Sequence, residues 1–171
     1  GYDLSRCSCD GLGAAVNDIT THQDFQLSGR VSREMVERLQ REIAKRPQYE
    51  PITEHFFFGG MYCRSVWRDA GVLVVGKVHK KEHFYLIVQG RVKMTTDDEV
   101  VEAMAGALFM SKPGTKRAVI SLEPTLCMTF HRTDATTVEE AEAELIEDDP
   151  SALFNADNKA CTEPKKLDVV G

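Results

Sequence analysis

The sequence has no apolar run long enough to cross a bilayer, and it opens with no basic and apolar signal segment. Lys and Arg are not in excess either, since 21 of them stand against 27 Asp and Glu, which gives a net charge of -6. Phosphate contacts need an excess of basic residues on one face. We therefore expect a soluble intracellular protein that binds neither membranes nor, in general, nucleic acid.

Zinc-ribbon spacing is also missing from the odd set of five cysteines. Cys7 and Cys9 could form half of a metal or redox site, but we interpret them as two free thiols in a loosely organised leader. Cys63 and Cys127 lie in strand-like runs, where we expect small buried hydrophobes. The sequence shows no nucleophile beside a base and no phosphate-binding glycine loop, so it identifies no catalytic residue.

The length of 171 residues, with 42% hydrophobic residues, fits one domain with a core of its own. We divide the chain into an N-terminal leader and helix (1–50), a β-barrel (51–133), and a C-terminal acidic helix with an extended tail (134–171).

Two helices are predicted, one on each side of the β region. Ser32 is expected to cap the first, over 33–45, whose apolar stripe would cover a sheet. The second opens with a capping-box pattern at Thr137 and runs to about 146. The tail from Asp149 is expected to be an arm that either lies along a neighbouring subunit or stays mobile.

From residue 51 onward the sequence breaks into short β-rich runs separated by turn residues. The runs are expected at 56–58, 61–68, 72–79, 83–89, 91–96, 100–103, 107–111, 117–122 and 125–131. Because no helical segment separates them, a βαβ fold with parallel strands is disfavoured. The predicted fold class is mainly β, with the strands in a barrel or sandwich.

The stretch 72–89 combines apolar alternation, two histidines and a short charged turn. We predict that its two runs form a hairpin, in which His79 and His83 are cross-strand neighbours within reach of one metal ion or one anion. Two histidines alone bind a metal poorly, and the candidate third ligand is His131, at the end of the last run. The residues that share the parity of His83, and should line the same cavity, are Tyr85, Ile87 and Gln89.

These residues carry a resemblance to a known family, because the region of about 55–132 resembles the cupin superfamily of small double-stranded β-barrels, or jelly rolls. The first cupin motif runs from a glycine through a His-x-His pair and a Glu to a closing glycine. Gly90 matches the closing glycine. Counting back from it places His83 at the Glu and His79 at the second His, and Lys77 then occupies the position of the first His.

The second cupin motif carries Pro-x-Gly followed by a His. Gly106, Pro113 and Gly114 resemble this motif, and Arg117 lies near the place of its His. The pattern at 76–84, taken with 113–117, is also similar to uncharacterised cupin-like proteins encoded by bacteriophages.

The resemblance implies a metal site in which only His79 keeps the residue type of a customary cupin ligand. His83 would replace the Glu, and His131 would be an additional ligand from a neighbouring strand. Three histidines would suit Zn, Fe, Ni or Cu. Lys77 and Arg117 place positive charge near the same mouth, which opposes a cation and favours a carboxylate or phosphate. The predicted metal ligands are His79, His83 and His131, and the predicted ligand-binding residues are Lys77, Tyr85, Gln89 and Arg117.

Some further charged and imidazole side chains are assigned no place in this site. The lysines interpreted as solvated turn charges are Lys80, Lys81 and Lys116. The histidines outside the barrel motifs are His22 and His55.

Two functions are compatible with these observations. In the first, a cupin-fold protein binds a small anionic molecule, a divalent metal or both through the histidine cluster, with catalysis left open. In the second, the barrel is the scaffold of a non-catalytic structural or accessory protein, and the termini drive assembly. We expect a cytoplasmic location, or a virion if the protein is phage-encoded. We also expect a homo-oligomer, because barrel edges and the aromatic run 56–58 favour association.

Overall fold

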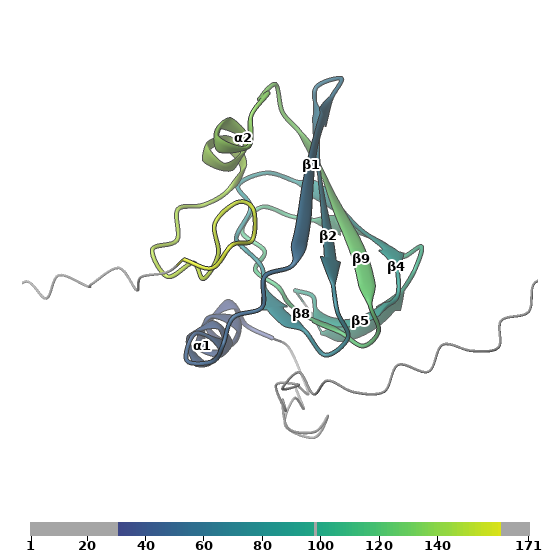
Figure 1. Ribbon diagram of the computed structural model, residues 1–171, viewed down its shortest axis with the longest axis vertical. Coiled ribbons are helices and arrows are strands. Elements are labelled where there is room, and N and C mark those ends of the chain that lie inside the picture. The colour runs from purple at the N-terminus through teal and green to yellow at the C-terminus, as the bar shows by residue number, and fades with distance from the viewer. Residues whose placement is uncertain (1–30, 98, 162–171) are drawn as a thin grey trace, which may run out of the picture.

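The computed structural model describes residues 31–97 and 99–161, which contain nine strands and two helices (Figure 1). The strands are β1 (Ile52–Phe58), β2 (Met61–Arg68), β3 (Leu73–Val75), β4 (His83–Gln89), β5 (Arg91–Thr95), β6 (Val100–Met104), β7 (Leu108–Ser111), β8 (Ala118–Ser121) and β9 (Thr125–Arg132). The helices are α1 (Arg33–Ile43) and α2 (Val138–Leu145). The predictions for Cys7, Cys9 and His22 lie outside the described residues.

The strands pair antiparallel and form two sheets. The five-stranded sheet has the order β1-β2-β9-β4-β7, and the four-stranded sheet has the order β3-β8-β5-β6. From β3 to β9 the chain passes repeatedly between the two sheets, as in a jelly roll. The prediction of a mainly β, jelly-roll barrel with one helix on each side is confirmed.

A core of apolar side chains joins the two sheets. Ile87 and Cys127 from the five-stranded sheet pack with Val92, Met94 and Val119 from the four-stranded sheet. The predicted burial is confirmed for Cys127 but not for Cys63, which is only half-buried. The core fixes the spacing of the sheets. The candidate site lies at the opposite end of β4 from Gln89, at the first residue of the strand, His83.

Helix α1 begins where predicted, because the Ser32 side chain accepts a hydrogen bond from the Met35 amide. It ends two residues before the predicted 45. Val36 is buried and packs with Ala118, so the helix covers the four-stranded sheet at β3 and β8.

The predicted hairpin between 72–79 and 83–89 is wrong. Strand β3 pairs with β8 in one sheet, whereas β4 pairs with β7 and β9 in the other. Residues 76–82 carry the chain between the sheets, and His79 forms an isolated β-bridge with Ile146. A jelly roll pairs strands that are distant in sequence. Two runs of alternating apolar residues on either side of a short turn therefore need not pair with each other.

Helix α2 begins after Thr137, as the capping pattern predicts, and the Thr137 hydroxyl accepts a hydrogen bond from the Glu140 amide. Ala141 and Leu145 are buried against Tyr62, so α2 covers the barrel where β2 begins. Neither helix in the described part of the chain has the length and apolar character needed to span a membrane.

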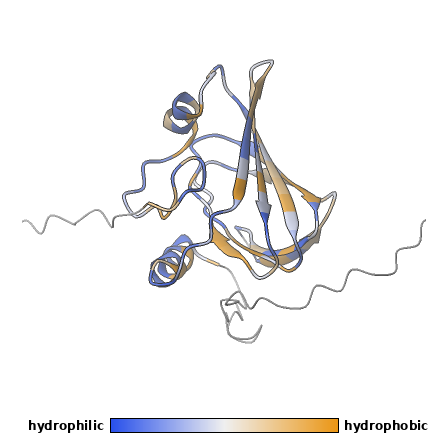
Figure 2. Ribbon diagram, in the orientation of Figure 1, coloured by the Kyte–Doolittle hydropathy of each residue, from blue (hydrophilic) through white to orange (hydrophobic). Residues whose placement is uncertain are grey.

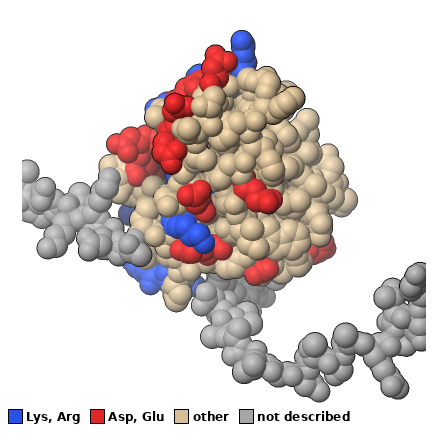
Figure 3. Space-filling model, turned by 45° about the horizontal axis from the view of Figure 1, so that its top comes forward, with Lys and Arg blue, Asp and Glu red and all other residues tan. Residues whose placement is uncertain are grey.

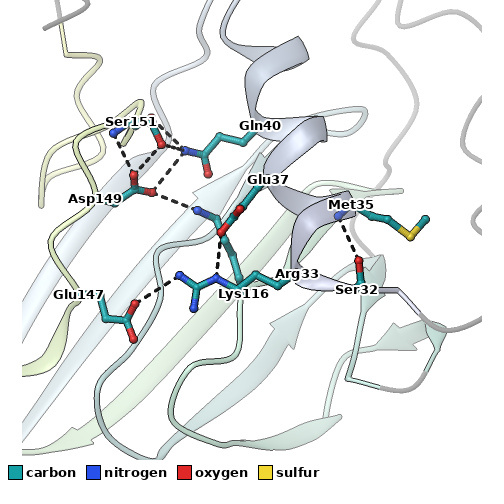
Figure 4. A network of polar contacts seen from close by, with 9 residues as sticks. All are labelled: Ser32, Arg33, Met35, Glu37, Gln40, Lys116, Glu147, Asp149 and Ser151. Carbon is teal, nitrogen blue, oxygen red and sulfur yellow. Dashed lines mark hydrogen bonds and ion pairs between the residues drawn. The ribbon is translucent and has the colours of Figure 1, made fainter. Parts of the chain in front are cut away.

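The chain after α2 folds back onto its own barrel, so the predicted extended arm is wrong for residues 149–161. Asn158 donates a hydrogen bond to Thr53 Oγ1 on β1. On α1, Gln40 Nε2 donates to the Ser151 carbonyl at 2.9 Å (Figure 4). Polar contacts with two distant elements therefore hold this segment in place.

The prediction that Lys116 is a solvated turn charge is also wrong. Its side chain is 3% exposed, and its Nζ lies 3.0 Å from Asp149 Oδ2 (Figure 4). Lys80 and Lys81 are exposed, as predicted. A charge in a turn can be buried when a segment from elsewhere in the chain supplies its counter-ion.

Candidate metal centre

Three histidines meet beside α2. His83 is the first residue of β4, and His131 is the next-to-last residue of β9, which lies beside β4. His79 belongs to the 76–82 segment between the sheets. The structure therefore brings the three predicted metal ligands together, although the hairpin that was expected to do so is not formed.

The geometry of the cluster is compact. The ligand nitrogens of the three imidazoles all lie within 4.8 Å of one another. The ring centroids of His79 and His83 are 4.0 Å apart, and the His131 ring lies 4.9 and 4.7 Å from them. Around a tetrahedral ion with bonds of about 2.0–2.1 Å, nitrogen ligands are roughly 3.3 Å apart. Small side-chain rotations would therefore bring these nitrogens to bonding distance.

The backbone on both sides of His79 is held by the end of α2 and by the chain that follows it. The Lys80 amide donates to the Leu145 carbonyl at 2.7 Å, and the Glu147 amide donates to the Val78 carbonyl at 2.9 Å. His79 is thus positioned by residues more than sixty places later in the sequence. No local pattern in the sequence reports these contacts.

The imidazoles are in the state that metal binding requires. Burial lowers the pKa of each ring. Nearby His83 and Arg64 lower the pKa of His131 further, to about 3. The rings are therefore neutral at pH 7 and keep a lone pair for a metal. The Nδ1 atoms of His79 and His131 are buried and have no hydrogen-bond partner among the described residues, so the donor set fits a metal ion.

Tyr62 packs against His131 from the side of α2. Its ring stacks on His131 and Phe57 at centroid distances of 5.8 and 4.8 Å. The Tyr62 hydroxyl lies 2.7 Å from His55 Nδ1, and burial raises the pKa of Tyr62 to about 12. His55 also lies 3.1 Å from an Asp157 oxygen, and it takes part in positioning Tyr62 rather than in the histidine cluster.

A cavity of about 160 Å³ opens beside the histidines. His79 and His83 line it, and the folded-back segment 149–161 supplies part of its wall. The apolar residues of the wall include Val66, Val74, Val75, Val119, Leu153 and Phe154.

Two arginines of this cavity, Arg64 and Arg68 on β2, were not identified from the sequence. Arg68 donates hydrogen bonds to Tyr85 Oη at 3.0 Å and to Cys127 Sγ at 2.8 Å. Arg64 donates to Asn158 Oδ1 at 2.5 Å. The Nε atoms of both arginines are buried without a partner among the described residues.

Arg64 and Arg68 are four residues apart on a strand, so the sequence predicts that they share one face of the sheet. The sequence does not show whether that face is the inner or the outer one.

Three of the four predicted ligand-binding residues line the cavity: Lys77, Tyr85 and Arg117. Lys77 Nζ lies 2.6 Å from Glu142 Oε2, so its charge is compensated within the protein. Arg117 donates to Ser111 Oγ at 2.7 Å, and no carboxylate of the described residues lies within 4.0 Å of its guanidinium.

The predicted place of Gln89 in the cavity is wrong, because its side chain is exposed and absent from the cavity wall. The pairing of β4 with β9 shifts between Ile87, opposite Cys127, and Gln89, opposite Leu126. This bulge reverses the side-chain parity after Ile87. Ile87 itself belongs to the core rather than to the cavity wall.

Of three comparisons with known proteins, only the comparison with solved structures finds matches. No family model matches the chain, and no curated protein matches its sequence. Among solved structures, a cupin superfamily protein from Desulfitobacterium hafniense is 14% identical over 54% of this chain and 88% of its own, with a TM-score of 0.44. The cupin domain of Schizosaccharomyces pombe Cnp3 is 19% identical over 60% and 77%, also with a TM-score of 0.44. These identities and TM-scores are too low to support an argument, so the fold class rests on the order of the strands in the two sheets.

Proposed function

We propose that the protein is a cupin-type metal-binding protein, in which His79, His83 and His131 hold one divalent transition-metal ion. The observation that carries this proposal is the cluster of neutral imidazoles, two of which have buried Nδ1 atoms with no hydrogen-bond partner among residues 31–97 and 99–161. Imidazole suits Zn, Fe, Ni and Cu, and the cluster contains no carboxylate that would favour Mg or Ca.

The charges around the cluster support a second, anionic ligand. The nearby Glu142 carboxylate is already shared by Lys77, at 2.6 Å, and Arg64, at 3.9 Å. Arg68 and Arg117 have no ion-pair partner among the described residues. A divalent ion on neutral ligands would add further positive charge. Uncompensated charge is costly in an enclosed site, so we propose that a small organic anion binds beside the metal.

The cavity limits the size and character of this anion. About 160 Å³ is on the order of the space that one aromatic ring fills. The valine side chains of the wall would contact an apolar body, while the guanidinium groups would receive a carboxylate. Arg117 and Tyr85 both line this cavity, and we propose that they orient the ligand. A bound metal would act as a Lewis acid on an oxygen of that ligand.

Elemental analysis of the purified full chain tests the metal site. We expect about one metal ion per chain after reconstitution with Zn, Fe, Ni or Cu, and loss of that metal in His79→Ala and His83→Ala. His55→Ala is the matched control, because His55 lies outside the cluster, and it should keep the metal. Circular dichroism would confirm that each variant folds.

Two results would contradict the metal proposal. The first is no stoichiometric metal with any of the four ions, which would favour the interpretation of the barrel as a scaffold. The second is an equal loss of metal in His55→Ala, because the loss in the other two variants could then not be assigned to the removal of a metal ligand.

Thermal unfolding of the metal-loaded protein tests the anion. Benzoate and malonate, titrated against chloride at equal ionic strength, should raise the midpoint by a few degrees. Arg117→Gln should weaken the apparent affinity by about tenfold or more. Arg91→Gln is the control, because Arg91 is solvent-exposed on β5 and pairs with Glu102 and Glu123. Equal effects of carboxylates and chloride would contradict the anion proposal and leave the metal proposal standing.

A further inference from the structure

The five-stranded sheet has one face toward the cavity and a second face, here called the outer face, that is apolar. The strand register places one residue of each strand in a single row across the sheet: Phe56, Cys63, Phe130, Phe84 and Met110. The adjacent row consists of Glu54, Ser65, Met128, Leu86 and Leu108. Four of the five strands therefore contribute only apolar or small side chains to both rows.

Many large apolar side chains of the outer face are open to solvent in one chain. Those most exposed are Phe58 (87%), Met110 (80%), Ile52 (66%), Leu108 (57%), Met61 (52%), Phe56 (49%) and Phe84 (47%). Figure 2 shows the apolar segments along β1, β2 and β9, and Figure 3 shows a broad area with few charged atoms on this side of the molecule. Isolated exposed apolar residues are ordinary, but a continuous apolar face marks an interaction surface.

Strand β2 has the reverse of the usual polarity. Its inward-facing positions include Arg64 and Arg68 of the cavity, and its outward-facing positions are Met61, Cys63, Ser65 and Trp67. In an antiparallel sheet with one wet face, the polar residues lie outside. Hydrophobic side chains on the outside of β2 are therefore expected to be covered when the protein is in its working state.

We propose that a second copy of this chain covers the outer face, sheet against sheet, in a two-fold dimer. The exposed parts of these side chains amount to on the order of 800 Å², which is about what each partner contributes to a standard stable interface. An apolar row that crosses a sheet can pack against its own copy without matched charges. Two twisted sheets pack face to face in this way in β-sandwiches.

The charges of the face disfavour a membrane as the occupant. The rows contain one acidic residue, Glu54, and Arg132 lies at the end of β9 opposite Met61. An anionic lipid surface attracts clusters of Lys and Arg. The outer face has no such cluster, and the whole chain has a net charge of -6.

Sedimentation of the full chain between about 1 and about 100 μM tests the proposal. We expect a species of twice the 19.1 kDa of one chain at the upper concentration. Methionine oxidation by peroxide then locates the interface. Met110 on the outer face should be oxidised at least about threefold more slowly at high concentration. Met35 on α1, which points away from the polar network in Figure 4, should react at the same rate throughout.

Matched variants complete the test. Phe84→Lys should raise the dimer dissociation constant by about tenfold or more, whereas Met35→Lys should leave it unchanged. Both positions are exposed in one chain, so neither change is expected to unfold the protein. A monomer at the highest concentration overturns the proposal, and so does a dimer in which Met110 is not protected. Protection of Met110 at all concentrations in a monomer also overturns it, because the cover would then belong to the same chain.

Discussion

The ion pair between Lys116 and Asp149 joins the turn before β8 to the segment that follows α2. Lys116 is almost fully buried, while the Asp149 side chain remains 24% exposed. Burial by itself raises the pKa of Asp149, but hydrogen bonds from Ser151 and Lys116 outweigh it and hold the pKa at about 2. The carboxylate is therefore the stable form of Asp149 in the folded protein at any pH above that value.

Replacement of Asp149 by Asn should destabilise the protein by about 1–3 kcal/mol at pH 7, because it leaves the Lys116 charge buried without a counter-ion. The folded pKa of Asp149 lies below its unfolded value, so the carboxylate contribution is full above about pH 4 and is lost as the pH falls through about 2. The difference between wild type and variant should shrink over that window. Urea unfolding of both proteins at several pH values measures this difference in the free energy of unfolding.

Glu123→Gln is the control for this substitution, since Glu123 is half exposed and pairs with exposed Arg91. It should change stability by less than about 0.5 kcal/mol. Adding Lys116→Met to Asp149→Asn should recover part of the loss. A variant as stable as wild type at pH 7 would show that solvent reaches Lys116.

Single residues also show where sequence reasoning succeeds and where it stops. The three histidines were identified because two of them flank a short turn and the third ends a β-rich run. Arg64 and Arg68 were missed because alternation predicts two faces without telling which one is inside. On β2 the apolar face is the outer one, so the usual assignment would have placed both arginines in solvent.

At the scale of elements, the turn between β4 and β5 depends on Gly90. Its φ of +81° is one that L side chains rarely adopt, and a Cβ at this position would collide with the Pro124 carbonyl oxygen before β9. Gly106, between β6 and β7, has a similar φ of +91°, but a Cβ there would meet no atom within 4 Å. A side chain at either glycine would strain the backbone, but only a side chain at Gly90 would also collide with another part of the chain.

Gly90→Ala should consequently destabilise the protein by roughly 2 kcal/mol more than Gly106→Ala. The Gly106 substitution should cost about 1 kcal/mol, from the left-handed backbone alone. Chemical denaturation of both variants gives the difference. Equal losses would mean that the β4–β5 turn shifts to accept the methyl group, and they would contradict a fixed approach of this turn to Pro124.

The elements themselves were predicted well where a local signal exists. The limits of β2 and β4 agree with the predicted runs, and both helices begin at their predicted caps. The pairing of β3 with β8, and the return of residues 149–161 to the barrel, were not predicted. Both depend on contacts between residues far apart in the sequence, which periodicity and turn chemistry do not record.

Across the whole molecule, the histidine cluster joins three parts of the fold. His83 and His131 lie on paired strands of one sheet, whereas His79 lies on the connection between the sheets, which is held by the chain after α2. A metal ion bound by all three would therefore link the sheet to the α2 region. Since such an ion binds the folded state, it should also suppress local opening at this junction.

Amide hydrogen exchange measures that suppression. Metal should slow exchange at the amides of Lys80 and Glu147, which bridge the 76–82 segment to the chain after α2, relative to protein treated with a chelator. At a metal concentration of 100 times Kd the global stabilisation should be about 2.7 kcal/mol. The Thr96 amide, which donates to the Glu99 carbonyl in the β5–β6 turn, is expected to exchange by local opening, so it is the reference that metal should leave unchanged. In His79→Ala the difference at Lys80 and Glu147 should vanish. If metal still slows exchange at these amides in His79→Ala, the ion binds without His79, and the link between the sheet and α2 must have another origin.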